Sequence, residues 1–292
     1  MHAIFRQLHS FLITRQRVFV LTLLAMLAFA GNSLLCRIAL KQTGIDAASF
    51  TTIRIVSGAI ALWLIVRVRA GPPDRSGSWA SALALFAYAA AFSFSYLSLT
   101  AATGALLLFA TVQVTMIGYG RWQGVRMSRR QTAGLLAALA GLVYLLLPGL
   151  SAPPLHGSLL MIVAGAAWGI YSLRARGSGD PLRVTAGNFL RAVVPALALG
   201  AAMLPAASID GRGVVLAIAS GALASGVGYA LWYSALAGLN VTRAATVQLS
   251  VPVLAALGGV LFLDEALTLR LTVASAAILG GIAAVVTDRR PA

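Results

Sequence analysis

Ten long apolar stretches follow one another along this chain of 292 residues, and they limit its fold more than any other feature. A membrane-spanning helix needs about 20 mostly apolar residues. Strands of a membrane barrel would alternate apolar and polar residues, whereas these runs are continuous. The predicted spans are Val18–Leu40, Phe50–Val66, Trp79–Leu99, Gly104–Tyr119, Arg130–Leu147, Gly157–Leu173, Val184–Met203, Val214–Leu236, Ala244–Leu263 and Leu271–Thr287. We therefore predict an all-α membrane protein with ten transmembrane helices.

The composition supports this class. Hydrophobic residues make up 60% of the chain and charged residues only 10%, against about 25% charged residues in a typical soluble domain. Such a chain has too little polar surface for a soluble protein and too much apolar surface for a disordered one. The segments between spans are too short to fold as soluble domains, so any activity must lie within the bundle.

The formal charge of +15 suggests a nucleic-acid partner, but the placement of the charges argues against one. Most basic residues fall in alternate gaps between the spans, which is the pattern of cytoplasmic loops. These are Arg6, Arg15, Arg17, Arg67, Arg69, Arg75, Arg121, Arg126, Arg129, Arg130, Arg174, Arg176, Arg183, Arg243, Arg289 and Arg290. We therefore expect a multi-pass protein of the bacterial inner membrane, with both termini cytoplasmic and the basic loops near anionic lipid.

The start of the chain has features of a signal peptide, with a cleavage-like triplet at Ala28-Phe29-Ala30. Its apolar run continues past that point, so we expect an uncleaved first helix. The chain has a single cysteine, Cys36, which excludes an intrachain disulfide.

An internal repeat divides the chain into two halves, residues 1–148 and 149–292. A shift of 137 residues superposes Arg54 on Arg191 and the stretch 92–99 on 229–236, and further matches follow in the same order. These are Thr111-Val112-Gln113 with Thr246-Val247-Gln248, Arg130 with Arg270 and Gly141 with Gly281. Five spans per half is an odd number, so the halves are inverted in the membrane. Inverted repeats are typical of secondary transporters, and channels such as aquaporins use them too.

These features resemble the drug/metabolite transporter superfamily, in its ten-helix EamA-type branch. The resemblance covers nearly the whole chain and rests on the two five-helix halves and on a few local motifs. The motifs are Trp168-Gly169, the arginine in the second helix of each half and the turn Asp264-Glu265-Ala266-Leu267-Thr268. The first half departs from the last motif, with Gly124-Val125-Arg126-Met127-Ser128, and has Ala30 where a Trp is usual. These departures make the halves functionally unequal.

The resemblance implies a secondary transporter, not driven by ATP, that exports small metabolites by alternating access through a central cavity. Within the branch the chain is most similar to the exporter of aromatic amino acids and of methyl viologen. Amino acids, aromatic ones included, are therefore the expected substrates. Export of cationic drugs or of other metabolites is the alternative. Outside this class, a membrane receptor or assembly factor would not need a polar path.

The residues themselves argue against an enzyme or an ATP-driven pump. The three histidines and all seven acidic residues lie outside the apolar runs, and the chain has neither a phosphate-binding glycine loop nor a zinc motif. We therefore expect no catalytic residue, no metal and no cofactor. The expected partners are a small-molecule substrate and the lipid bilayer. Because each chain contains both halves, it should function as a monomer.

Polar and aromatic residues inside the spans are the candidates to line a central path. They are Asn32, Ser33, Tyr88, Ser95, Tyr96, Gln113, Trp168, Tyr171, Tyr233 and Gln248, with Thr111 and Thr246 beside them. The aromatic residues could instead anchor the helices at the membrane interface. The amides could instead form hydrogen bonds between helices. Small residues at four-residue spacing in the fifth and tenth spans, such as Gly134 and Gly281, indicate scaffold helices.

Arg54 and Arg191 are the only charges well inside apolar runs. A charge at the centre of a bilayer is unfavourable by about 2.5–3.5 kcal/mol, so each arginine either extends to the interface or stabilises a gate. We favour a structural or gating role over substrate contact for both. Pro252 follows Gln248 by one turn and would free a backbone carbonyl at a bending point.

No titratable acid lies inside an apolar run, so we predict facilitated movement down the substrate gradient rather than proton coupling. Asn32, Gln113 and Gln248 would then meet the charges of a zwitterion as neutral groups. The loop acids Asp264 and Glu265 could still line a gate and titrate there.

Overall fold

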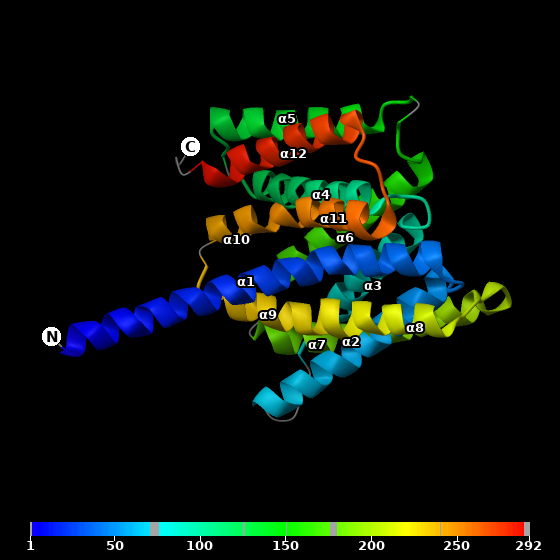
Figure 1. Cartoon of the computed structure of the whole chain (residues 1–292), viewed down its shortest axis with the longest axis horizontal. Coiled ribbons are helices and arrows are strands. Elements are labelled where there is room, and N and C mark those ends of the chain that lie inside the picture. The colour runs from blue at the N-terminus through cyan, green and yellow to red at the C-terminus, as the bar shows by residue number, and fades with distance from the viewer. Residues whose placement is uncertain are drawn as a thin grey trace.

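The computed structural model describes residues 2–70, 76–124, 126–149, 151–175, 180–239 and 241–288, and the described chain is helical without a strand (Figure 1). The helices are α1 (His2–Gln42), α2 (Ala47–Ala70), α3 (Trp79–Ser95), α4 (Ala101–Trp122), α5 (Arg129–Leu146), α6 (Leu155–Arg174), α7 (Pro181–Ala202), α8 (Gly211–Ile218), η2 (Ala219–Val227), α9 (Gly228–Leu236), α10 (Val241–Gln248), α11 (Ser250–Leu263) and α12 (Leu269–Thr287), with a 3-10 turn, η1 (Leu204–Ala206).

These elements form ten helical spans in the described part of the chain, because α8, η2 and α9 run on as one and α10 leads into α11. Eight of the spans are long and apolar enough to cross a membrane, and α3 is a shorter apolar helix. Large apolar side chains cover the outside, such as Leu261 at 73% and Phe19 at 68% exposure. The predicted ten-helix membrane fold is confirmed, and the protein is a multi-pass membrane protein.

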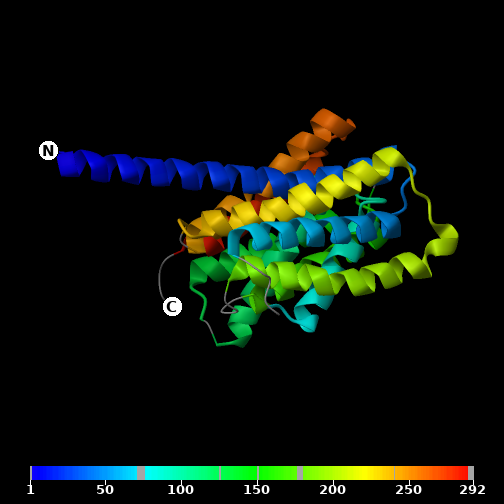
Figure 2. The same cartoon turned by 90° about the horizontal axis from the view of Figure 1, so that it is seen from below.

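Both termini lie at the same end of the bundle, beyond which α1 projects (Figures 1 and 2). We call this the terminal end. The loops α1–α2, α3–α4, α5–α6, α7–α8 and α11–α12 lie at the other end, which we call the distal end.

Two spans depart from the continuous helices that the sequence predicted. The span Val214–Leu236 contains a π-helical segment, η2, where Gly221 lies so close to α2 that a Cβ atom would overlap the Arg54 carbonyl. The span Ala244–Leu263 breaks at Leu249. Pro252 has no N–H to donate to the carbonyl of Gln248, which explains a break at this place.

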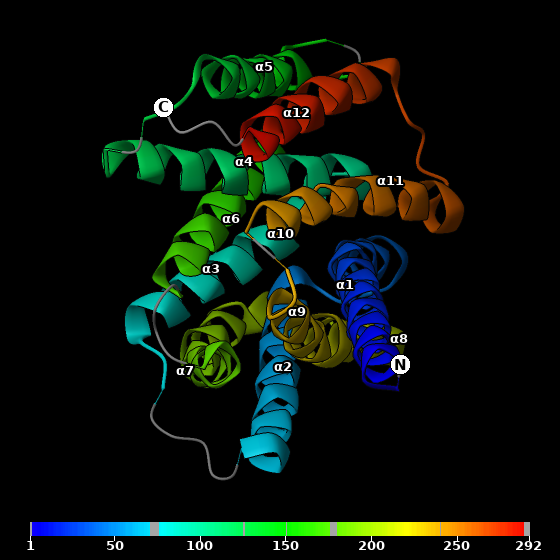
Figure 3. The same cartoon turned by 90° about the vertical axis from the view of Figure 1, so that its left-hand side faces the viewer.

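The helices pack as two groups of three spans, each drawn from both halves. The first triad is α3, α4 and α6. The second triad is α1, the α8–η2–α9 span and the α10–α11 span. Helices α2 and α7 pack on each other between the triads, while α5 and α12 pair to one side (Figure 3). Exchanging the first five spans with the last five converts one triad into the other, as expected for inverted repeats.

The pair α5 and α12 is held by small residues at the predicted positions. A Cβ atom on Gly281 would lie 2.4 Å from the carbonyl oxygen of Gly134, and one on Gly141 would lie 2.9 Å from Ala277 Cβ. The two backbones therefore approach closely. Neither helix lines the cavity described below, which agrees with a scaffold.

Candidate functional site

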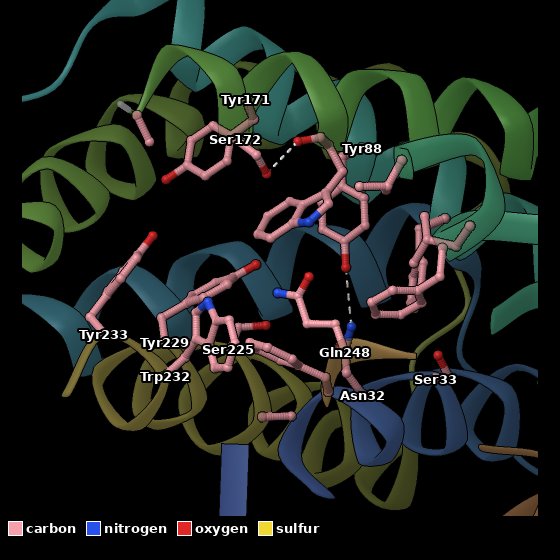
Figure 4. Close-up of a pocket in the computed structure, with 18 of the residues that line it drawn as sticks. Asn32, Ser33, Tyr88, Tyr171, Ser172, Ser225, Tyr229, Trp232, Tyr233 and Gln248 are labelled. Atoms are coloured by element: carbon pink, nitrogen blue, oxygen red, sulfur yellow. Dashed lines mark hydrogen bonds between the residues drawn. The ribbon is translucent and has the colours of Figure 1, made fainter. Parts of the chain in front are cut away.

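A cavity of about 290 Å³ lies between the two triads. Figure 4 shows Tyr88, Tyr171 and Ser172 on one wall, from the first triad, facing Asn32, Tyr229 and Trp232 from the second. At one end, which we call the deep end, the cavity is lined by Asn32 of α1 and Tyr88 of α3. At its other end the cavity reaches Ala175 and Pro181, beside the α6–α7 connection at the terminal end.

Aromatic rings form most of the cavity wall. Trp168 stacks on Tyr229 across the two triads, with centroids 5.4 Å apart and planes at 19°, and on Tyr171 at 5.2 Å and 27°. The ring centroids of Tyr88 and Trp168 are 4.9 Å apart. The ring of Tyr233 stacks on that of Tyr229, with centroids 6.3 Å apart. Rings stacked in this way form a continuous and largely apolar wall.

A chain of hydrogen bonds closes the deep end of the cavity. Ser220 Oγ donates to Asn32 Oδ1 at 2.7 Å, and Asn32 Nδ2 donates to the Tyr88 hydroxyl at 3.3 Å. The three residues come from η2, α1 and α3 and are all buried. Asn32 thus both bonds between helices and lines the cavity, so the two roles considered for it occur together.

Arg54 extends from α2 to the same hydroxyl. Its Nη2 atom donates to Tyr88 at 3.1 Å, and its guanidinium carbon lies 4.8 Å from the Phe92 ring centroid. Only 3% of the residue is exposed. Its Nη1 atom is buried without a hydrogen-bond partner, and Arg54 forms no ion pair with any described residue.

The other second-helix arginine is bonded differently. Arg191 Nη1 donates to the backbone carbonyls of Ser76 at 2.8 Å and Gly187 at 2.9 Å. It therefore ties α7 to the chain just before α3. Arg54 and Arg191 match in the sequence repeat but not in their contacts. Pro252 is buried in α11 and does not line the cavity.

Seven of the ten predicted lining residues meet at the cavity: Asn32, Ser33, Tyr88, Trp168, Tyr171, Tyr233 and Gln248. The other three are buried elsewhere. The Ser95 hydroxyl donates to the Phe92 carbonyl, Tyr96 ends α3 with its ring beside Gly104, and Gln113 lies on α4 away from the wall. Thr111 and Thr246 do not line it either.

The cavity also includes residues that the candidate set omits. The larger ones are Phe29, Phe92, Phe109, Met116, Tyr229 and Trp232. Phe92 and Tyr229 occupy matched places in the repeat, on α3 and α9. Their alignment was the signal that could have identified them, because residues at a pseudo-two-fold axis face each other.

A buried ion pair lies at the distal end, and its acid, Glu265, belongs to the turn before the last helix. Arg37 lies within α1 at 8% exposure, and its Nε donates to Glu265 Oε1 at 3.0 Å. Arg37 Nη1 also donates to the Tyr96 carbonyl at 2.7 Å, and Glu265 Oε2 accepts from the Ala101 N–H at 2.7 Å. This group, which we call the distal lock, joins α1, the start of α4 and the α11–α12 loop.

A second set of contacts joins the distal loops. Asp46 Oδ2 accepts from the Ser208 N–H at 2.9 Å, and Asp210 Oδ2 accepts from the Gly44 N–H at 2.6 Å. Burial raises the pKa of Asp46, but hydrogen bonds from Ser49, Ser208 and Ala48 outweigh it and lower that pKa below 3.8. The Gly213 N–H likewise lowers the pKa of Asp210.

The chain is similar in sequence to known transporters and in fold to a solved structure. The sequence model of the EamA-like transporter family matches residues 155–287. An uncharacterized protein of Pseudomonas aeruginosa is 56% identical over 276 residues, covering 94% of this chain and 96% of that protein. An uncharacterized transporter of Archaeoglobus fulgidus is 30% identical over 250 residues, with 83% and 87% covered. A protein crystal structure that is 19% identical shares the fold, with a TM-score of 0.65 over 93% of this chain and 97% of that one.

Proposed function

Because the chain belongs to the EamA-like transporter family, we propose that it exports small metabolites, most of all amino acids with aromatic side chains. The proposed mechanism is alternating access without ATP, through the cavity between the two triads. The observation that carries the proposal is the aromatic wall of that cavity, formed by Trp168, Tyr171, Tyr229 and Tyr233.

The size and chemistry of the cavity support a small, partly apolar substrate. Its volume of about 290 Å³ lies at the lower end of the range for small-molecule sites, about 300–1,000 Å³. Flat aromatic faces favour aromatic side chains, with each aromatic pair worth about 0.5–1.5 kcal/mol beyond area burial. Polar side chains are spread along the wall, with Asn32 and Tyr88 at one end and Ser172 and Tyr233 towards the other.

The two ends of the path support alternating access. The cavity reaches the terminal end, whereas the distal lock joins the two triads at the other. Basic residues concentrate in the loops of the terminal end, which supports a cytoplasmic position for that end in a bacterial inner membrane. The structure then corresponds to a state that loads substrate from the cytoplasm. Release requires that the Arg37–Glu265 pair separate while the terminal end closes.

A cationic drug is the second candidate, because the faces of Trp168 and Tyr229 suit an organic cation. Two observations argue against a cationic substrate. No acidic residue is found among the described residues that line the cavity, and Arg54, which contacts Tyr88 of the wall, has no acidic partner among the described residues. A receptor or assembly factor is less well supported, since such a protein needs no cavity at mid-bundle.

Counterflow in proteoliposomes tests the proposal. Vesicles loaded with a panel of unlabelled amino acids should take up labelled phenylalanine or tryptophan faster than vesicles loaded with buffer, and protein-free vesicles provide the control. Mixing active and inactive chains should lower the rate in proportion, since one chain holds the whole path. Exchange of methyl viologen but of no amino acid would favour the second candidate, and no exchange of either would refute both.

A further inference from the structure

The Tyr88 hydroxyl is surrounded by donors in a way that leaves its own proton free. It accepts hydrogen bonds from Asn32 Nδ2 at 3.3 Å and from Arg54 Nη2 at 3.1 Å. A phenol has one O–H donor and two acceptor lone pairs. With both acceptor sites used, the remaining donor is available to the cavity, into which Tyr88 projects (Figure 4).

The donors behind Tyr88 are held in fixed directions. Ser220 donates to the carbonyl oxygen of Asn32, so the Asn32 amide nitrogen must face Tyr88. Arg54 adds a full positive charge, which cannot be lost because guanidinium remains protonated in proteins. The deep end of the cavity therefore presents donors and positive potential but, among the described residues, no negative group.

Arg54 lacks the counter-charge that its position calls for. It is 97% buried, its Nη1 atom has no partner, and its nearest described neighbours include the rings of Tyr88 and Phe92. A charge in such surroundings is normally paired. Arg191 differs, since backbone carbonyls bind its guanidinium. A ligand anion that accepts from the Tyr88 hydroxyl would be separated from Arg54 Nη2 only by that hydroxyl oxygen, and it would supply the missing charge.

We propose that Tyr88, supported by Arg54 and Asn32, forms a carboxylate subsite, and that the substrates are monocarboxylates with an apolar or aromatic body. The inference rests on the proposed export function and narrows its substrate class. Tyr88 donates directly to the carboxylate. Arg54 is a positioning residue that acts through Tyr88 and through its charge. The proposal adds the charge of Arg54 to the neutral groups that were expected to meet the charges of the substrate.

Three related ligands separate the carboxylate from the rest of the molecule: phenylalanine, 3-phenylpropionate without the ammonium group, and phenethylamine without the carboxylate. Calorimetry on the purified protein in lipid nanodiscs gives their affinities. Both carboxylates should bind at least about tenfold more tightly than phenethylamine, since hydrogen bonds to charged groups are among the strong ones.

Tyr88→Phe keeps the ring and removes the hydroxyl. It should weaken both carboxylates about tenfold and leave phenethylamine within about twofold, which a merely structural role would not do. Arg54→Gln should also weaken the binding of both carboxylates. If Arg54→Gln folds poorly, Tyr88→Phe alone still tests the subsite. Tyr119→Phe is the matched control. It removes a hydroxyl on α4 that also accepts from an amide nitrogen, that of Gln123 at 3.0 Å, and that lies outside the cavity lining, so the three affinities should stay unchanged.

The outcomes separate this inference from the proposed function. Binding of 3-phenylpropionate that depends on Tyr88, without binding of phenylalanine, would support the subsite and refute amino acids as substrates. Binding of phenylalanine that Tyr88→Phe leaves unchanged would overturn the subsite and retain the proposed function. Equal loss of all three ligands in Tyr88→Phe would also overturn the subsite, and binding of none by the unaltered protein would refute both.

Discussion

The two ends of the bundle have related folds but are held by different contacts. At the distal end, Arg37 and Glu265 form a buried ion pair between the first helix and the loop before the last one. At the terminal end, Arg174 of α6 is the residue that the repeat matches with Arg37; it is exposed, and its Nε donates to the Ser81 hydroxyl at 3.2 Å. The sequence that matches Asp264-Glu265 is Gly124-Val125; Val125 lies outside the described residues.

Inverted repeats give the two ends of the bundle the same arrangement of helices. They do not give the two ends the same side-chain contacts. The helices supply the symmetry, while single side chains decide which end is held. Under the proposed mechanism, an acid in one half and an apolar residue at the matched sequence position of the other favour opening at the terminal end. That bias suits a protein that loads substrate there.

The largest expected effect comes from breaking the distal lock. Arg37→Gln would leave the Glu265 carboxylate buried without its cation, which destabilises proteins by about 3–5 kcal/mol. The matched variant Arg174→Gln, at the terminal end, should change stability by no more than about 0.5 kcal/mol, as surface substitutions do. Thermal unfolding of the two purified variants, followed by tryptophan fluorescence, measures the difference. Equal losses would show that the two ends are held alike.

A moderate effect is expected in the cavity, where substitutions should change transport more than stability. Trp168→Ala removes a ring stacked on both Tyr171 and Tyr229. At about 0.5–1.5 kcal/mol per aromatic contact, transport of an aromatic substrate should fall several-fold without being abolished. Trp122→Ala is the control, since Trp122 is 80% exposed at the end of α4. Unchanged transport in Trp168→Ala, at equal abundance in the membrane, would make the stack purely structural.

The smallest effect concerns pH at the distal loops. The pKa of Asp46 and that of Asp210 lie below the ordinary 3.8. A lowered pKa stabilises the fold above the unfolded-state pKa, and this contribution is lost as the pH falls through the folded-state pKa. The two carboxylates should therefore have little effect on the melting temperature between pH 7 and pH 5. When the pH is lowered below about 4, the melting temperature should decrease. Asp46→Asn should make the decrease in melting temperature at low pH smaller. A decrease as large as that of the unaltered protein would show that Asp46 does not contribute to it.

Most of the fold could be predicted from the sequence, because ten apolar runs and the alternation of basic loops leave few arrangements open. The interruptions within the spans, such as the π-helical segment η2, could not be predicted from the sequence. The π-helical segment η2 depends on the close approach of Gly221 to α2, a tertiary contact that no local pattern records. The mixing of the halves into triads likewise follows from packing, since α6 lies with α3 and α4 rather than with its own half.

The site was predictable in its residue types and less so in its geometry. Polar and aromatic residues within spans led to Tyr88, Trp168 and Tyr171, but the pattern does not say which face of α4 meets the cavity, so Gln113 was included and Phe109 omitted. The distal lock was missed because Arg37 and Glu265 are 228 residues apart and both sit near span ends. Charges there are expected to face water, and only tertiary structure shows that these two are buried.

The proposed mechanism requires that the distal lock close the distal end of the path, and the reactivity of Cys36 measures this closure directly. It is the single cysteine of the chain, is fully buried in α1, and immediately precedes Arg37. In proteoliposomes, an impermeant maleimide applied from the distal side should label it slowly in the unaltered protein and at least about tenfold faster in Glu265→Gln, because losing the ion pair favours opening. Arg174→Gln should label as slowly as the unaltered protein. The same slow rate in all three proteins, or an equal rise in both variants, would contradict the claim.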